Sequence, residues 1–364
     1  MGIEPPRFGV EEEFLVVDQV TRTVVPEAAT VIARAEASLG KRVGGDITRL
    51  QVEARTDPCL TVEQLYAQLA EGRRVLDEAA AAGGLRVVAT GTPVLAEPGA
   101  PPMTDELAIC SVHVHVELPE TEQALMVSNH LRPHLPSLIA LAANSPYWNR
   151  RDTGYASWRT MISSRWPVAG PPPYFTSVEH HDALVNTLHD AGALVDNGTI
   201  FWDIRPSALL PTLEIRVADV PMTAQESALF AALVRALVVH VLPAVEAGDP
   251  GPVIPAELLR LAYWRAARDG LGGSGVDPLT GRLVPTVDLV EWLLQTIRPV
   301  LEEHGDLDRV VGWLRALIRD GDGATRQRRA AERTGGLTGV VDELITQTAG
   351  HASAGVTGEE STDR

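Results

Sequence analysis

Lysine is nearly absent from this chain of 364 residues: Lys41 is the single lysine, and the other 30 of the 31 basic residues are arginines. A reaction through a Schiff-base lysine would have only Lys41 available. A Walker-type phosphate loop is excluded, because Gly40-Lys41-Arg42 lacks both the upstream glycine and the following serine or threonine of that motif. The arginine bias itself indicates genomic base composition.

Cysteine is also scarce, and the net charge of the chain is negative. Two cysteines, Cys59 and Cys110, are too few for a disulfide framework in a chain of this length, so we expect a reducing, cytoplasmic location. The formal net charge of −17 argues against nucleic acid and anionic membranes as partners, because both demand clustered cations. With 45% hydrophobic and 22% charged residues, the composition is that of an ordinary globular protein.

Sequence signals for secretion or membrane insertion are not evident. Residues 1–6 contain no basic stretch followed by an apolar core, so we expect no secretory signal. The most apolar window, residues 227–245, is interrupted by Arg235, His240 and Pro243. We predict that this window forms a buried helix and not a membrane span.

Alternation of apolar and polar residues predicts β-strands in the first two thirds of the chain. The predicted strands cover residues 7–17, 47–55, 85–90, 111–118, 200–206 and 212–219. From about residue 221 onward the pattern is mainly helical, so the predicted fold class is α+β. The proline-rich loop 167–173, flanked by Trp166 and Tyr174, is either a lid over a site or a plain connector.

Helix starts and ends are marked by capping residues. Thr61 and Thr223 each stand three residues before a glutamine or glutamate, which is the spacing of a capping box. Pro255 and Gly270 mark the start and end of another helix. We predict a single domain over residues 1–350, followed by a disordered tail at 351–364, where the residues are small and polar.

Most of the predicted strands carry their charged residues on one face. Because alternate residues share a face, Glu11 and Glu13 lie on one side of the first strand, while Glu12 points to the aliphatic side. Glu12 is therefore predicted to be structural, as the partner of an ion pair. The same division groups these residues on the polar faces of the other strands: Arg49, Gln51, Glu53 and Arg55; His113, His115 and Glu117; Asp203 and Arg205; Glu214 and Arg216.

This shared polar face has two interpretations. One such strand indicates no more than the solvent side of an antiparallel sheet. When several strands agree, a concave sheet that holds divalent cations is the simpler explanation, since Glu11 and Glu13 repel each other unless a cation lies between them. Carboxylates with a histidine suit Mg²⁺ or Mn²⁺, and the sequence lacks the cysteine pairs of a structural zinc site.

The arginines interleaved with these carboxylates predict an anionic ligand. A guanidinium group holds phosphate through a two-pronged fork of N–H donors. Metal ligands, phosphate ligands and the lack of a phosphate loop together favour phosphoryl transfer from a nucleotide held by metal ions.

Several segments also resemble one family over about residues 8 to 330. They are GVEEEFLVVD (9–18), QVE (51–53), HVHV (113–116), DTGYASWR (152–159), WDIRPS (202–207), PTLEIRVAD (211–219), WRAARDG (264–270) and RQR (326–328). Their order and spacing resemble the glutamate–cysteine ligase type 2 family, the YbdK-like carboxylate–amine ligases. The resemblance implies a glutamine-synthetase-like fold, in which a curved antiparallel sheet forms an open funnel backed by helices, with a mainly helical C-terminal part.

The resemblance also implies an activity: ATP and Mg²⁺, or Mn²⁺, convert a small carboxylic acid to an acyl phosphate, which an amine or amino acid then attacks. Glutamate is one candidate acid, and the identity of both substrates stays open. A guanidino-kinase-like phosphotransferase on the same fold and a non-catalytic nucleotide- or metal-binding protein are the alternatives. A homo-oligomer is compatible with the sequence.

Site residues follow from the same motifs. The resemblance implies that Glu11, Glu13, Asp46 and Glu53 are metal ligands, and that His113 and Glu214 hold a metal nearer the nucleotide phosphates. Arg216, Glu53 and Arg205 are implied to be catalytic, with Arg216 on the transferred phosphoryl group and Arg205 and Arg159 as clamps on phosphate or substrate. His115 is either a metal ligand itself or a donor that supports a ligand from outside the metal shell, and the supporting role is favoured. Arg265 and Arg268 either reach the nucleotide or pair with Asp269 or Glu257.

The histidine strand departs from the family pattern at both ends. Cys110-Ser111-Val112 stands where family members more often have a glycine, and Glu117 stands where another glycine is expected. These departures are expected to shape the pocket for the acid or the amine.

Overall fold

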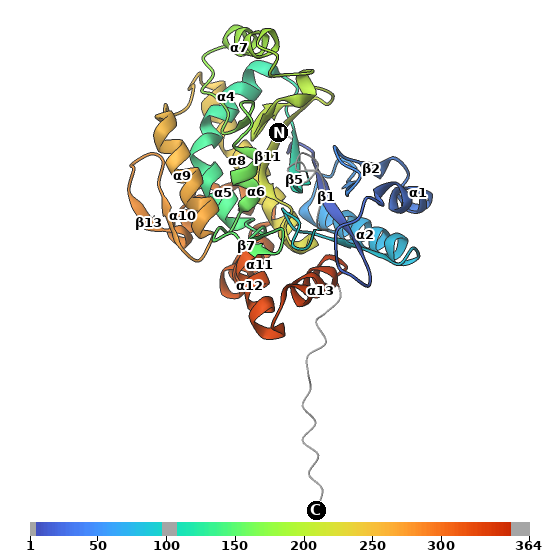
Figure 1. Cartoon of the computed structure of the whole chain (residues 1–364). Coiled ribbons are helices and arrows are strands. Elements are labelled where there is room, and N and C mark those ends of the chain that lie inside the picture. Colours follow the sequence, from blue (N-terminus) through green and yellow to red (C-terminus); the bar gives the residue numbers. More distant parts are fainter. Residues whose placement is uncertain (1–4, 97–107, 351–364) are drawn as a thin grey trace, which may run out of the picture.

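The computed structural model describes residues 5–96 and 108–350, so the predicted tail at 351–364 lies outside the described residues. The strands are β1 (Phe8–Asp18), β2 (Val43–Gly45), β3 (Gln51–Arg55), β4 (Leu85–Val88), β5 (Ser111–Glu117), β6 (Tyr147–Trp148), β7 (Arg151–Asp152), β8 (Ala169–Gly170), β9 (Phe201–Trp202), β10 (Ile204–Pro206), β11 (Thr212–Asp219), β12 (Ser274–Val276) and β13 (Leu283–Pro285). Helices and strands alternate irregularly along the first two thirds of the chain, which confirms the α+β class (Figure 1).

Helices follow or separate these strands along the whole described chain (Figure 1). They are α1 (Ala28–Leu39), α2 (Val62–Ala81), α4 (Thr121–Leu131), α5 (Leu135–Leu141), α6 (Trp158–Ser163), α7 (Val178–Asp190), α8 (Ala224–Glu246), α9 (Ala256–Asp269), α10 (Thr286–Glu303), α11 (Leu307–Asp320), α12 (Gly323–Thr334) and α13 (Leu337–Thr348), with short 3₁₀ turns at Gly40–Arg42, Arg132–His134 and Asn197–Thr199. The mainly helical C-terminal part is confirmed, since only the short β12–β13 hairpin interrupts it in the described chain.

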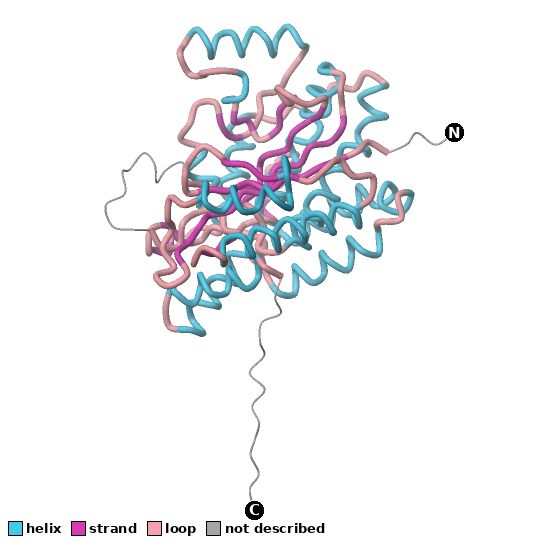
Figure 2. Tube along the Cα trace, turned by 90° about the vertical axis from the view of Figure 1, so that its right-hand side faces the viewer, coloured by secondary structure: helices cyan, strands magenta, loops and turns pink. Residues whose placement is uncertain are grey.

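One seven-stranded antiparallel sheet organises the molecule. Its order is β10-β11-β5-β1-β3-β2, and β4 pairs with the second half of β1 where β5 has left that edge. β1 is therefore central, with β3 on one side and β5 followed by β4 on the other. Figure 2 shows the strands running through the middle of the molecule with helices packed around them.

Two predicted strands are wrong in part. Of the predicted strand 47–55, only residues 51–55 form a strand, β3, which pairs with β2. Asp46 lies in the turn between them, where its carboxylate accepts a 3.0 Å hydrogen bond from Gln51 Nε2. The predicted strand 200–206 breaks at Asp203. β9, before the break, pairs in parallel with β8, whereas β10, after it, joins the main sheet.

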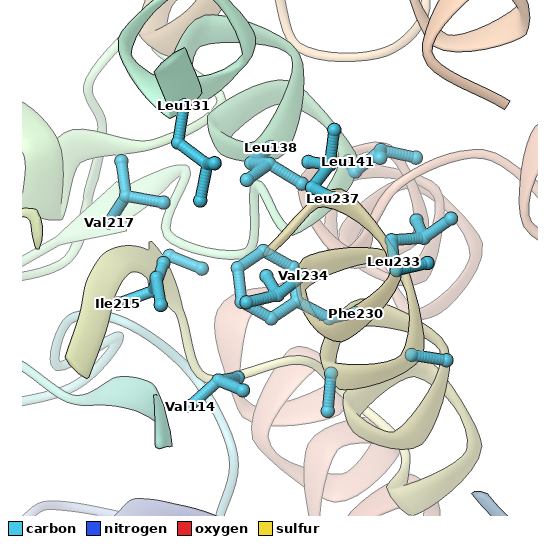
Figure 3. Packing of buried hydrophobic residues seen from close by; sticks show 14 of the residues in the cluster. Val114, Leu131, Leu138, Leu141, Ile215, Val217, Phe230, Leu233, Val234 and Leu237 are labelled. Carbon is cyan, nitrogen blue, oxygen red and sulfur yellow. The ribbon is translucent and has the colours of Figure 1, made fainter. Parts of the chain in front are cut away.

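The aliphatic face of the sheet is buried against helices. Val114 and Ile215 are fully buried, and they pack toward Phe230, Val234 and neighbouring apolar residues of α8 (Figure 3). α8 is long and apolar enough to cross a membrane by length and composition alone, yet most of it is buried inside the protein. This confirms the prediction of a buried helix for residues 227–245.

The capping residues act as the sequence predicts. Thr61 forms a complete capping box with Gln64 at the start of α2, and the Thr223 hydroxyl accepts from the Glu226 backbone N–H at the start of α8. Gly270 ends α9 in a positive-φ conformation (φ 60°), where a residue with a Cβ would be strained.

Glu12 points into the core, as its position in β1 predicts. It forms a buried ion pair with Arg73 of α2, and the Ser227 hydroxyl of α8 donates to the same carboxylate at 2.5 Å. Arg73 also donates to the carbonyls of Pro221 and Met222 at 2.9 Å each. Glu12 thus ties β1 to two helices and leaves Glu11 and Glu13 on the opposite face. Both cysteines of the chain are free and buried.

Candidate functional site

Strand register brings the polar side chains of the sheet together. Glu13 lies directly opposite Glu53 in the β1–β3 pair, and Glu11 lies opposite His113 in the β1–β5 pair. On the next strand Glu214 lies opposite His115. We refer to the set Glu11, Glu13, Asp46, Glu53, His113, His115 and Glu214 as the acidic cluster.

The two histidines lie among the carboxylates. His113 Nδ1 is 3.4 Å from Glu11 Oε2 and 3.8 Å from Glu214 Oε1, and its Nε2 is 3.5 Å from Glu13 Oε1. His115 Nε2 is 3.6 Å from Glu11 Oε2 and has no hydrogen-bond partner, although it is buried. Glu11, His115 and Glu214 can each offer a ligand atom within 4.8 Å of the others, so they form a group that could hold a metal ion.

Around Glu11, Glu214 and His113, the surroundings favour ionised carboxylates beside a neutral imidazole. Burial opposes ionisation of Glu214, but Arg216, His113 and Arg205 lower its pKa to about 2. Burial and the charge of Arg216 lower the pKa of His113 to about 4, so His113 is neutral at pH 7. Burial opposes ionisation of Glu11 as well, yet the neighbouring imidazoles of His113 and His115 hold its pKa below the ordinary value. Ionised carboxylates and a neutral imidazole are the forms that bind metals.

On the other side of the acidic cluster, at Glu13, Asp46 and Glu53, the carboxyl pKa values are raised. Burial and the charge of Asp46 raise the pKa of Glu13 to about 8. Burial and the charge of Glu11 raise the pKa of Glu53 to about 9, while Arg55 opposes this shift. Burial and Glu11 also raise the pKa of Asp46. The raised pKa values of Glu13 and Glu53 favour their protonated forms near neutral pH as long as no cation lies between them.

Arg216 is expected on the transferred phosphoryl group, and Arg205 and Arg159 are expected as clamps on phosphate or substrate. All three lie at or beside the acidic cluster and pair with its carboxylates or with nearby backbone. Arg216 forms an ion pair with Glu214 and lies 3.4 Å from His113 Nδ1, inside the acidic cluster. Arg205 pairs with Glu214 at 2.9 Å and donates to the carbonyls of Gly198 and Ile200 at 2.7 and 2.6 Å. Its contacts hold Glu214 in place.

Arg159 supports the strand that carries Arg216. Its Nη2 donates to the Arg216 carbonyl at 2.7 Å, and its Nη1 lies 3.7 Å from Asp219. The β11–β5 register shifts between Ile215 and Ala218, so Arg159 binds the irregular part of the strand. Arg159 Nε is buried without a partner.

Arg265 and Arg268 lie apart from the acidic cluster. Both pair with Asp269, at 2.6 and 3.2 Å, and Arg268 also lies over the Trp264 ring. This is the pairing that the sequence left open as an alternative to a nucleotide contact.

Hollows flank the acidic cluster on both sides. A hollow of about 430 Å³, which we name the hairpin hollow, touches Glu11 and His115 and is lined further by Arg7, Gly9, Val10, Arg55, Pro58, Glu117 and Leu210. A smaller cavity of about 80 Å³, the junction cavity, touches Glu13, Asp46, Ser111, Arg159, Asp203 and Arg216. The hairpin hollow thus meets the ionised side of the cluster, and the junction cavity meets the protonated side.

The junction cavity is next to a much larger one. This proline-loop cavity has a volume of about 870 Å³ and shares Arg159, Ser163, Trp166, Ala169 and Asp203 with the junction cavity. Its walls are α6, α9 and the loop that contains Pro171, Pro172 and Pro173. The loop 167–173 therefore borders a cavity beside the acidic cluster.

Sequence reasoning missed several residues of the site. The Ser111 hydroxyl and backbone N–H donate to Glu13 Oε2 at 2.9 and 2.6 Å, and the hydroxyl also lies 2.7 Å from His113 Nε2. Ser111 belongs to the departure from the family pattern and binds a predicted metal ligand directly. Arg55 pairs with both Glu53 and Glu11. His115, for which the sequence left a ligand role and a supporting role open, lies with Glu11 and Glu214 in the group that could hold a metal ion.

Comparison with known proteins agrees with this geometry. The family model described as glutamate-cysteine ligase family 2 matches residues 7–347. A protein from Nocardia farcinica, named as a candidate glutamate–cysteine ligase, is 42% identical over 94% of this chain and 93% of its own length. A relative of the same kind from Mycolicibacterium smegmatis is 43% identical over 94% of this chain and 98% of its own length.

Solved structures resemble the fold at low sequence identity. The glutamate–cysteine ligase of Francisella tularensis, solved with AMP, has a TM-score of 0.69 at 11% identity and covers 96% of this chain and 89% of that one. A bifunctional glutathione synthetase from Pasteurella multocida has a TM-score of 0.68 at 15% identity over 95% of this chain, which spans about half (52%) of that protein. The glutamine-synthetase-like fold is therefore confirmed, and the chain belongs to glutamate–cysteine ligase family 2.

Proposed function

We propose that this protein is an ATP-dependent carboxylate–amine ligase that forms an amide bond through an acyl phosphate. The observation that carries the proposal is the acidic cluster, which separates two hollows on one face of the sheet. Five carboxylates and two histidines from β1, β3, β5, β11 and the β2–β3 turn meet there, beside Arg216. Family membership supports the same reaction class.

The residues present fit divalent metal ions, because His115 Nε2 is an unpartnered buried ligand atom and Glu13 and Glu53 oppose each other without a cation. Glu11, His113, His115 and Glu214 would hold metal beside the hairpin hollow, and Glu13, Asp46 and Glu53 would hold metal beside the junction cavity. Bound Mg²⁺ would neutralise the triphosphate and the charge that develops during transfer.

The hairpin hollow is assigned to the nucleotide. It lies at the side of the acidic cluster where Glu11 and Glu214 are ionised and would hold the metal ion that carries the nucleotide phosphates. Pro58, Leu210 and Pro211 give it an apolar wall that suits a base. The volume of about 430 Å³ lies within the roughly 300–1,000 Å³ range of small-molecule sites.

The acid substrate is assigned to the junction cavity. Its carboxylate attacks the terminal phosphorus of ATP, the bond from that phosphorus to the ADP oxygen breaks, and an acyl phosphate forms. Arg216, held by Glu214 at the edge of this cavity, donates to the transferred phosphoryl group and stabilises its charge. Arg205 and Arg159 are positioning residues, since Arg205 holds Glu214 and Arg159 holds the backbone of Arg216.

The loop 167–173 excludes water from the acyl phosphate. It borders the route from the proline-loop cavity to the junction cavity, and Trp166 lines both. An acyl phosphate that meets water hydrolyses, so a covered site favours attack by the amine.

The test is a product assay with ATP, Mg²⁺ and a panel of carboxylic acids, first with hydroxylamine and then with amines. Hydroxamate formation reports the acyl phosphate, and ADP release together with an amide reports ligation. Glu53→Gln removes a proposed metal ligand and is expected to abolish both. Glu63→Gln, on the exposed surface of α2, serves as the matched control with full activity.

Two outcomes would overturn the proposal. A stable phosphorylated product without an amide would assign the protein to the guanidino-kinase-like alternative. Nucleotide binding without ADP release under any acid and amine would assign it to the non-catalytic alternative.

A further inference from the structure

The proline-loop cavity contains charged groups that the proposed phosphoryl transfer leaves unused. Arg132 lines it and is buried, with no carboxylate within salt-bridge distance in the described part of the chain. Its Nε donates to the Pro172 carbonyl at 3.0 Å, and its Nη1 has no partner. A buried guanidinium without an opposite charge is costly to keep, so this side chain is suited to an anionic ligand.

Asp203 is the complementary group. Its side chain is 9% exposed, lines both the proline-loop and the junction cavities, and has no arginine within salt-bridge distance among the described residues. Burial raises the pKa of Asp203 to about 6, although Arg159, Tyr263 and Arg216 oppose the shift. Its backbone is fixed on both sides, because its N–H donates to Gly170 and its carbonyl accepts from Arg216 N–H, each at 2.8 Å.

Tyr263 of α9 links the two charged groups. Its hydroxyl is buried and completes no hydrogen bond of ordinary geometry. Burial and the nearby Asp203 carboxylate raise the pKa of Tyr263, and Arg132 opposes this shift, so both charges act on the same hydroxyl. A carboxylate, a guanidinium and a free hydroxyl are the groups that recognise an ammonium and a carboxylate on one molecule.

The space is large, and its remaining wall has an apolar part beside the polar residues Thr160, Ser163, Ser164, Glu257 and Arg260. Met161, Trp166, Pro173, Leu261 and Trp264 line the cavity, which lies near the upper end of the roughly 300–1,000 Å³ range of drug-sized pockets at about 870 Å³. A cysteine side chain would leave most of this wall uncovered.

We propose that this cavity binds the amine substrate, and that this substrate is an amino acid or short peptide with a bulky apolar side chain. Its ammonium lies at Asp203, its carboxylate pairs with Arg132, and its side chain packs against the wall of Trp166 and Leu261. The inference rests on the proposed ligase function and names the substrate class that this function left open.

Asp203 accepts the proton that the amine must lose before it can attack. The ammonium gives one proton to the Asp203 carboxylate, and the freed amine attacks the acyl carbon. A C–N bond forms and the bond from the acyl carbon to the phosphate oxygen breaks. The second N–H proton leaves with the phosphate, so the products are an amide and inorganic phosphate. Asp203 is placed for this step, since it borders the junction cavity that also contains Arg216.

The test compares amines at a fixed acid and saturating ATP and Mg²⁺. Phenylalanine and leucine are expected to exceed cysteine and alanine in kcat/KM for amide formation by roughly tenfold or more. Phenylalaninamide, which lacks the carboxylate, is expected to lose roughly 30-fold against phenylalanine in the wild-type protein. Equal rates for cysteine and phenylalanine would overturn the bulky-substrate inference.

Variants separate recognition from folding. Arg132→Met is expected to raise the KM for phenylalanine but not for phenylalaninamide. Arg132→Lys keeps a positive charge, so its KM for phenylalanine is expected to lie between those of Arg132→Met and wild type. Tyr263→Phe removes a hydroxyl that completes no hydrogen bond of ordinary geometry, so it is expected to fold normally and still raise the KM. Arg298→Met, on the exposed surface of α10, controls for loss of an arginine. If Arg132→Met and Tyr263→Phe leave the KM for phenylalanine unchanged, the assigned contacts are wrong.

Trapping with hydroxylamine tests the proposed acyl phosphate separately from the proposed amine site. Hydroxylamine is uncharged at neutral pH and needs neither a base nor a carboxylate partner, so it traps the acyl phosphate directly. Asp203→Asn is expected to lower the ratio of amide to hydroxamate by roughly 100-fold. An unchanged ratio would refute the role of Asp203. Absence of hydroxamate in the wild-type protein with every acid would instead refute the proposed function.

Discussion

Glu13 and Glu53 face each other across the β1–β3 pair, and both side chains are buried. Like charges at directly opposed positions destabilise a sheet, so this arrangement persists only if protons or cations separate the two carboxylates. Burial is the main reason that both pKa values lie well above the ordinary 4.5, at about 8 and about 9. If the pair binds metal as proposed, it is expected to exchange protons for the metal near neutral pH.

Stability of the metal-free protein is expected to fall with pH because of this pair. The folded pKa is raised, so the contribution to stability is complete below about 4.5 and is lost as pH rises through about 8 to 9. Glu53→Gln imitates the protonated form and is expected to have a Tm increasingly above wild type between pH 6 and pH 9. Circular dichroism melts in EDTA measure this, with Glu63→Gln as the exposed control. A Tm difference independent of pH would contradict the assignment.

Metal binding is expected to release protons at pH 7.5. Mg²⁺ or Mn²⁺ replaces the protons on Glu13 and Glu53, while His113 is already neutral because burial and Arg216 lower its pKa to about 4. Calorimetric titration in two buffers of different ionisation enthalpy counts the protons. Glu53→Gln is expected to release fewer protons per metal than wild type. Equal proton release in both would show that Glu53 is not a ligand.

Glu214→Gln is expected to lower kcat for ADP formation by about 100-fold or more. Glu214 holds Arg216 and Arg205 and offers an oxygen to the three-ligand group, so one neutral amide weakens phosphoryl-group and metal contacts together. Steady-state rates measure the effect, and the exposed Glu122→Gln of α4 is the matched control. If the variant keeps at least half of the wild-type kcat, the assignment of Glu214 to the active site is wrong.

Much of the site was predictable because strand alternation assigns each residue to a face. Glu11 and Glu13 fall on one face of β1 and Glu12 on the other from the sequence alone, and the Arg73–Glu12 ion pair confirms this division. The buried helix was also predictable, because a segment as apolar as residues 227–245 is expected to be buried in the core.

Strand register was not predictable, because alternation within one strand does not say which residue lies opposite on the next. The contact between Glu214 and His115 depends on that register, and so does the position of His115 in the metal-binding group. Asp46 was assigned next to a continuous strand, although Gln51 and the β2–β3 turn determine its place. The bonds from Arg159 to backbone carbonyls of β11 leave no trace in side-chain patterns.

His115 is expected to determine metal affinity more than catalysis. Its Nδ1 lies 2.9 Å from the Thr212 hydroxyl, and an N–H at Nδ1 leaves the Nε2 lone pair free toward Glu11 and Glu214. His115→Gln is expected to raise the Mn²⁺ concentration for half-maximal activity by about 10- to 100-fold. Thr212→Val, which removes the orienting hydroxyl alone, is expected to give a smaller rise in the same titration. If His115→Gln needs the same Mn²⁺ concentration for half-maximal activity as wild type, His115 is not a metal ligand.

Arg73→Met is expected to destabilise the fold by about 3–5 kcal/mol, because it leaves Glu12 charged and buried without a partner. Replacing both residues, as Glu12→Leu with Arg73→Met, is expected to recover much of that loss, since an apolar pair needs no opposite charge. Urea unfolding of the single and double variants measures the free energies, and matching fluorescence and circular dichroism transitions check that unfolding is two-state. Because Glu12 points away from the acidic cluster, the folded double variant should bind Mn²⁺ as wild type does. A double variant less stable than Arg73→Met would show that the pair itself, and not the unpaired charge, governs stability here.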